Sequence, residues 1–296
     1  MSDPFPLPAP RTMPLSRNPQ TLTLYGTEHV GKTDSVMRLP GKVLNVMLQR
    51  KGGDHLAGWF MDLHEMVDKG DFGDEARTKQ SYDEAFYRTL EWLGNENAAG
   101  RPVADFIVYD RIDRMEDWVF KRALKTFRTT VIGRSEKFND LLRVTDIPGQ
   151  GNQGSPGWNF VREEMHRTVW GMQRSGPRVV LICGMRDKFA FSATPKTMGD
   201  AAPNDLDLTG SLRKLICNDS SSFGFMYRNH DSDLMLNFRT SETTVCGTYC
   251  AHLRGKEFTL GKVDKKTGDT VCDWSQIYLP DAPPAVLQTQ STKTAP

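Results

Sequence analysis

The residues best suited to chemistry in this chain lie together between positions 26 and 34, where two glycines bracket a short segment that runs into a lysine and a threonine. Their spacing matches G-x-x-x-x-G-K-[ST], the pattern of a phosphate-binding loop (Walker A). In such a loop, backbone N–H groups hold the phosphates, the lysine reaches the β- and γ-phosphates, and the hydroxyl ligates Mg²⁺. A glycine-rich turn without a ligand is the alternative. The pattern predicts these nucleotide-contacting residues: Gly26, Thr27, Glu28, His29, Val30, Gly31, Lys32, Thr33 and Asp34.

A phosphate-binding loop needs a strand before it and a helix after it. Residues 21–25 (TLTLY) have the composition of a strand and run directly into the loop. The segment 32–37 is predicted to begin a short helix, which a Pro-Gly pair ends before the next strand at 42–48. The loop therefore has the flanks it requires, with Lys32 predicted to reach the phosphates and Thr33 the metal.

A second requirement is an aspartate at the end of a neighbouring apolar strand, where it holds the metal. Residues 104–110 (ADFIVYD) form such a strand, although Asp110 could instead cap a following helix. A rival GTPase motif, D-x-x-G at 146–149, follows a segment that is a poor strand, and no N-K-x-D motif comes after it. The glycine-rich stretch 149–157 is better interpreted as a mobile loop. Thr33 and Asp110 are thus the predicted Mg²⁺ ligands.

Composition is typical of a globular protein. The 296 residues allow one large domain or two small ones, and a net charge of +1 means that any nucleic-acid surface must be local. No apolar run has the length of a membrane span, and five scattered cysteines favour a reducing cytosol over a disulfide framework. We therefore expect a cytoplasmic location and no membrane partner.

Strand and helix patterns alternate through most of the chain. Apolar residues have helical spacing over 81–93 and 158–172, and a further apolar strand is predicted at 178–184. This alternation predicts an α/β fold with a mainly parallel sheet and helices on both faces, and short strands after about residue 220 predict an antiparallel extension. The predicted organisation is a proline-rich arm at 1–20, a core at 21–220, a β-hairpin extension at 221–279 and a flexible tail at 280–296.

In their order, spacing and residue character, these segments resemble the bacteriophage nucleotide-binding proteins with a RecA-like core. This family includes phage single-strand annealing ATPases. The resemblance covers roughly residues 20–260, and only the glycine loop is a specific motif within it. The segments that carry it are YGTEHVGKT, RLPGKVL, ADFIVYDRIDRMEDW, PGWNFVREEMHRTVWGM, RVVLICGMRDK and CAHLRGKEF.

The resemblance implies a RecA-like P-loop NTPase core with ATP and Mg²⁺ as cofactors. It implies ATP hydrolysis coupled to single-stranded DNA in phage recombination, annealing or replication. It further implies a homo-oligomer in the host cell cytoplasm, with a single-strand-binding protein as an additional expected partner.

Two positions depart from that family. The strand after the loop usually ends in an acidic residue that activates the attacking water, whereas this chain has Gln49, which can orient a water but cannot take its proton. The last core strand usually ends in a polar sensor, and this chain has Gly184. We therefore expect slow hydrolysis, with a structural or regulatory nucleotide-binding module as the alternative. A small-molecule kinase is a third class, but no arginine-rich lid is evident.

Basic residues elsewhere suggest contacts with other molecules. Nine Lys/Arg against five acids lie between residues 111 and 143, and three of them, Lys121, Arg122 and Lys125, are the predicted DNA contacts, here called the helix cluster. Trp158 could stack a base, although a core position is the simpler interpretation. Arg254 and Lys256 are spaced to lie on one side of a strand. They could act in trans on a neighbouring subunit's phosphates, or they could form a solvated edge.

A zinc site is a weaker alternative. Two cysteines four residues apart in an extended strand are about 13 Å apart, which is too far for both to bind one metal unless a turn intervenes. The residues in question are Cys246, Cys250, His252 and Cys272.

Overall fold

The computed structural model contains no helix, among the residues it describes, that is long and apolar enough to cross a membrane. The predictions for the proline-rich arm up to residue 16, for the glycine-rich loop at 149–154 and for the tail from residue 281 lie outside those residues. The described residues are 17–49, 58–147, 155–186, 205–208, 212–241, 244–264 and 266–280.

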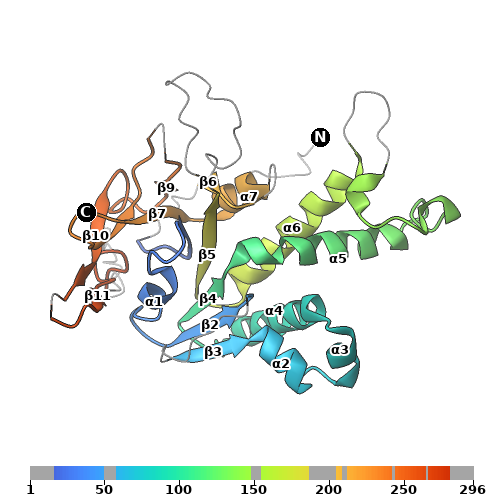
Figure 1. Ribbon diagram of the computed structural model, residues 1–296, viewed down its shortest axis with the longest axis horizontal. Coiled ribbons are helices and arrows are strands. Elements are labelled where there is room, and N and C mark those ends of the chain that lie inside the picture. The colour runs from blue at the N-terminus through green and yellow to red at the C-terminus, as the bar shows by residue number, and fades with distance from the viewer. Residues whose placement is uncertain are drawn as a thin grey trace, which may run out of the picture.

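One sheet runs through the molecule in the order β11-β10-β8-β7-β1-β5-β4-β2-β3 (Figure 1). Its parallel strands are β1 (Thr21–Gly26), β2 (Val43–Met47), β3 (Trp59–Asp62), β4 (Phe106–Asp110), β5 (Arg178–Arg186) and β7 (Ser222–Arg228). The antiparallel strands are β8 (Leu234–Asn237), β10 (Glu257–Val263) and β11 (Thr270–Cys272), with β6 (Asp205–Leu206) beside β5 and β9 (Gly247–Thr248) beside β7. The predicted α/β class, with a mainly parallel sheet and an antiparallel extension, is confirmed.

The predicted boundary near residue 220 divides the sheet in the wrong place. β7 was expected in the antiparallel extension, but it pairs in parallel with β1 from Leu22–Ser222 to Tyr25–Phe225. Antiparallel pairing begins only with β8. A strand's composition does not reveal its partner, because the direction of pairing depends on the path of the chain before it. Here the preceding helix α7 (Leu212–Asp219) supplies the crossover to a parallel position.

Helices cover one face of the sheet. They are α2 (Leu63–Lys69), α4 (Tyr82–Ala98), α5 (Glu116–Thr129), α6 (Gly157–Arg174) and α7. The short helix α3 (Asp74–Lys79) packs on α2 and α4. Buried Phe86, Val119 and Met165 pack there with Ile107 and Val179 of the sheet. The helices predicted at 81–93 and 158–172 are confirmed as α4 and α6. In Figure 1, α5 and α6 lie side by side and extend beyond the sheet as an arm.

The opposite face is covered differently from the prediction. The short helix α1 (Lys32–Val36) lies on it, and the chain between residues 250 and 278 covers the remainder. Val36, Trp274 and Ile277 pack with Val108 of β4, and the indole Nε1 of Trp274 donates a hydrogen bond to the Ser35 carbonyl (2.8 Å). The antiparallel extension therefore packs against α1 and the loop that precedes it.

Candidate functional site

The glycine loop makes the turn from strand to helix that the sequence predicts. Gly26 ends β1, and a Cβ at this position would lie 2.2 Å from the Met226 carbonyl oxygen of β7, so only glycine fits. His29 and Gly31 have positive φ values of 59° and 104°, and α1 begins at Lys32. The left-handed backbone at Gly31 is readily adopted only by glycine. Both glycines of the motif are thus required by local geometry.

The Lys32 ammonium lies inside the loop. Its Nζ donates hydrogen bonds to the carbonyl oxygens of Gly26 (2.8 Å) and Thr27 (2.6 Å). Burial and, to a smaller extent, the Arg111 guanidinium lower its pKa to about 8, although the nearby Asp110 carboxylate acts in the opposite direction. A poorly solvated cation with only neutral carbonyl acceptors is well suited to exchange those acceptors for an anion.

Thr33 and Asp110, the two predicted metal ligands, are in direct contact. The Thr33 hydroxyl donates a hydrogen bond of 2.6 Å to Asp110 Oδ2. The expectation that the strand ending in Asp110 neighbours the loop strand is wrong, because β5 lies between β1 and β4. Thr33 bridges the gap because it lies on α1, above the sheet edge. A hydroxyl and a carboxylate at this spacing fit Mg²⁺, which takes few protein oxygens and completes its shell with water and phosphate.

Arg111, at the same edge of the sheet, is an ion-paired residue that was not predicted to belong to the site. Arg111 follows Asp110 and donates from Nη1 to Glu28 Oε1 of the loop (2.8 Å), while its Nη2 lies 3.0 Å from Asp113 Oδ2. The Arg111 hydrogen bond also holds the pKa of Glu28 below its usual value. The available signal was the D-R-I-D sequence after the strand, whose basic residue was counted only toward a DNA surface.

The same guanidinium occupies the space beside Gly184, the position at which the resemblance led us to expect a polar side chain. A Cβ on Gly184 would lie 2.3 Å from Arg111 Nη2, so a larger residue would collide with it. The Gly184 backbone N–H donates to Asp113 Oδ1 (2.9 Å). The polar side chain beside Gly184 of β5 is therefore that of Arg111, which directly follows β4.

Gln49 lies beyond the end of β2, next to the strand of Asp110. Met47 pairs with Asp110, and the following backbone N–H of Leu48 donates to the Asp110 carbonyl (2.7 Å). The side chain of Gln49 is partly exposed. Another carboxylate, such as Glu28 or Asp54, could act as the base in place of Gln49. Glu28 is paired with Arg111, and Asp54 lies outside the described residues.

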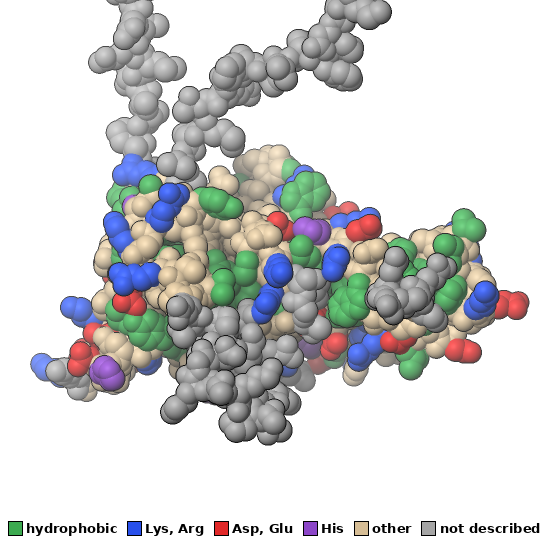
Figure 2. Space-filling model, turned by 90° about the horizontal axis from the view of Figure 1, so that it is seen from above, with side chains coloured by type: hydrophobic (Ala, Val, Ile, Leu, Met, Phe, Trp, Pro, Cys, Tyr) green, Lys and Arg blue, Asp and Glu red, His purple; other side chains and the backbone are tan. Residues whose placement is uncertain are grey.

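The helix cluster lies on α5, and two of its three charges are matched by carboxylates. Arg122 pairs with the buried Glu164 of α6 (3.2 Å), and Lys125 pairs with Asp83 (3.3 Å) and Glu84 (3.0 Å) of α4. Lys121 is exposed. On the face shown in Figure 2, basic and acidic side chains of the described residues are interspersed along the arm.

Trp158 packs edge-on against Phe120, with ring centroids 5.7 Å apart. It is therefore part of the packing between α5 and α6, which is the simpler of the two interpretations considered for it.

Arg254 and Lys256 are not on a strand. Arg254 lies in the turn at 251–255, and Lys256 directly precedes β10. Gly255 has a φ of 65°, which makes a tight turn where the sequence suggested extension. β10 begins opposite Asn237, the last residue of β8, and the strands β8 and β7 lie between β10 and the loop strand β1.

The residues considered for zinc have other contacts. Cys250 Sγ accepts a hydrogen bond from Ser222 Oγ (3.8 Å), and His252 Nε2 lies 3.0 Å from the Ile277 carbonyl. Across the ranges the structure describes, no three His, Cys, Asp or Glu side chains are placed to hold a metal together.

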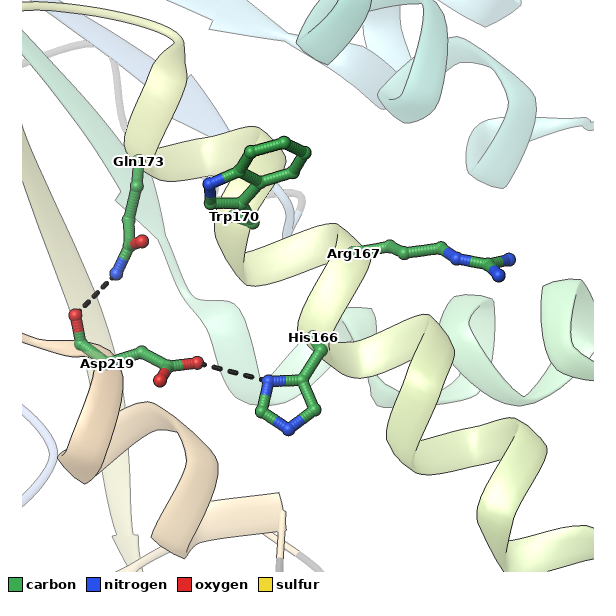
Figure 3. Close-up of a pocket in the computed structure, with 5 residues that line it drawn as sticks. All are labelled: His166, Arg167, Trp170, Gln173 and Asp219. Carbon is green, nitrogen blue, oxygen red and sulfur yellow. Dashed lines mark hydrogen bonds and ion pairs between the residues drawn. The ribbon is translucent and has the colours of Figure 1, made fainter. Parts of the chain in front are cut away.

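A concave surface lies between α6 and the end of α7 (Figure 3). His166 Nδ1 lies 3.3 Å from Asp219 Oδ2, and Gln173 donates to the Asp219 carbonyl, while Trp170 points away from both. These contacts tie the end of α7 to α6, and nothing in this arrangement resembles a reactive site.

No protein-family model matches the chain, and no curated protein matches its sequence. The geometry alone defines a class of site, in which a glycine loop with a buried lysine faces a hydroxyl–carboxylate pair at the carboxyl edge of a parallel sheet.

Proposed function

We propose that this chain binds ATP together with Mg²⁺ at the glycine loop, as a P-loop protein with a RecA-like core. The observation that carries the proposal is the 2.6 Å hydrogen bond between Thr33 and Asp110. The motif and the strand that ends in aspartate were selected separately from the sequence, 77 residues apart, as the two halves of a metal site. Their contact is what a shared metal requires, whereas a ligand-free turn gives no reason for them to meet.

The roles follow from the chemistry of each group. Lys32 neutralises phosphate charge, and the loop N–H groups donate to phosphate oxygens. Thr33 and Asp110 would hold Mg²⁺, which would supply positive charge to the phosphates when bound. Arg111 fixes Glu28 over this edge and adds positive charge near the phosphates.

We further propose slow ATP hydrolysis coupled to single-stranded DNA in phage recombination, annealing or replication, by a homo-oligomer that works with a single-strand-binding protein. The resemblance of the chain supports this part. Lys121 and the arm of α5 and α6 offer the local basic surface, and Arg254 and Lys256 would act on a neighbouring subunit. Ion pairing of Arg122 and Lys125 means that DNA would have to compete with carboxylates for both.

A second candidate is a structural or regulatory module that binds nucleotide without hydrolysing it. Gln49 favours this candidate, because an amide cannot take a proton from the attacking water. The pairing of Glu28 with Arg111 favours it as well.

Two measurements test the proposal. Calorimetry with ATP, with and without Mg²⁺, should show Mg²⁺-dependent binding, and an absence of binding would refute the nucleotide site. Phosphate release with and without single-stranded DNA separates the candidates, because stimulation supports the DNA-coupled ATPase and binding without turnover supports the module.

A further inference from the structure

Arg228 ends β7 on the flank of the glycine loop opposite Asp110. β7 and β1 are parallel and in register up to Tyr25 and Phe225, so both strands run out at the same edge of the sheet. A Cβ built on Gly31 would lie 3.1 Å from Arg228 Nη2, which is the only atom of the described residues within 4 Å of it apart from those of Gly31 and its chain neighbours. The guanidinium therefore lies directly beside the second glycine of the motif.

Neutral acceptors hold this guanidinium in place. Nη1 donates to the Ser232 carbonyl (2.6 Å), and Nη2 donates to the Thr270 hydroxyl (3.3 Å). Among the described residues no carboxylate forms an ion pair with Arg228, whereas Arg111 on the other flank is paired with both Glu28 and Asp113. Arg228 is thus positioned by its contacts, but its charge is not neutralised by them.

We infer that Arg228 is a second nucleotide-binding cation that acts within the same subunit and contacts the α-phosphate of a nucleoside di- or triphosphate. The inference rests on the proposed nucleotide site. The predicted metal ligands Thr33 and Asp110 meet on the side of the loop toward β4, where they would hold Mg²⁺ against the terminal phosphates. A phosphate chain held there would extend across the loop toward β7, and its α-phosphate would then be the anionic group within reach of Arg228.

Equilibrium binding of ADP and of a non-hydrolysable ATP analogue, both with Mg²⁺, tests this assignment. A charge-assisted hydrogen bond contributes about 1.5–3 kcal/mol, which corresponds to roughly 10- to 150-fold in affinity. Arg228→Ala should weaken both ligands by the same factor in this range, because the α-phosphate is common to them. Arg228→Lys should lose less, since it keeps the charge but not the fork of donors.

Arg239→Ala is the matched control. Arg239 is an exposed arginine just past the end of β8, and β8 pairs with β7 so that Arg228 faces Leu234 at the opposite end. Removing the same charge there should leave both affinities unchanged. Thr270→Val removes one acceptor of Arg228 and should cause a smaller loss, which keeps the test decisive if Arg228→Ala does not fold.

The outcomes are distinguishable. If the wild type binds neither ligand, the proposed function itself fails. If the wild type binds both and the Arg228 variants bind equally well, only this inference fails. A loss confined to the ATP analogue would move Arg228 to the γ-phosphate and overturn the α-phosphate assignment.

Discussion

Replacing Lys32 by Met is expected to weaken ATP binding and, at the same time, to leave the nucleotide-free protein at least as stable as the wild type. The fall of the Lys32 pKa from 10.5 to about 8 means that the protonated side chain is unfavourable in the folded state. At about 1.4 kcal/mol per pKa unit, the cost is on the order of 3 kcal/mol relative to the neutral form. Methionine removes this cost and retains the apolar stem.

Other contacts reduce the expected gain. The two hydrogen bonds from Nζ to the carbonyls of Gly26 and Thr27 are lost in the variant, at about 1 kcal/mol each. We therefore expect the free energy of unfolding of Lys32→Met at pH 7 to equal that of the wild type or to exceed it by about 1 kcal/mol. ATP affinity should fall by more than tenfold, because the phosphates lose a charge-assisted partner worth about 1.5–3 kcal/mol.

The pH dependence provides an independent check with a defined sign. Between about pH 8 and 10.5 the unfolded lysine keeps its proton while the folded one has lost it, so the unfolded state binds more protons and wild-type stability rises with pH. Lys32→Met lacks this contribution, and its advantage over the wild type should shrink across that window. Lys262→Met, which changes an exposed lysine of β10, is the control and should alter neither stability nor ATP binding.

Urea denaturation without nucleotide at pH 7 and pH 9.5, together with calorimetric titration of ATP, measures all three quantities. A loss of more than about 1 kcal/mol in the nucleotide-free variant would show that Lys32 is a structural cation of the loop. Unchanged ATP affinity would remove it from the nucleotide site.

Three further predictions concern the metal, the water and DNA. Asp110→Asn should abolish the Mg²⁺ dependence of ATP binding, measured by titration in Mg²⁺ and in EDTA; a retained dependence would place the metal elsewhere. Wild-type turnover should be slow compared with about 1–100 s⁻¹, and Gln49→Glu should raise it, whereas rapid wild-type turnover would contradict the role of Gln49. Changing the whole helix cluster to Ala should flatten the slope of log single-stranded DNA affinity against log salt by up to about two units. A change near 0.7 would mean that only Lys121 contacts phosphate and that the ion pairs of the other two persist, and no change would exclude this surface.

The local elements of the candidate site could be predicted from the sequence. The strand before the loop, the two glycines, Lys32, and the apolar strand ending in Asp110 were all identified from patterns spanning fewer than about ten residues. α4 and α6 were identified in the same way, because the spacing of buried residues in a helix is set by its own periodicity. The short strand β3 lacks so distinct a pattern and was missed.

Only the tertiary structure decided which groups meet. Strand order places β5 between β1 and β4, yet α1 brings Thr33 to Asp110 across that gap. The parallel pairing of β7 with β1 sets Arg228 beside Gly31. The tertiary structure also places the Arg111 side chain in the space that Gly184 leaves open. These contacts join residues that lie far apart along the chain, and local sequence carries no record of distant partners. Periodicity records which face of an element is buried, whereas the path of the chain determines what that face is buried against.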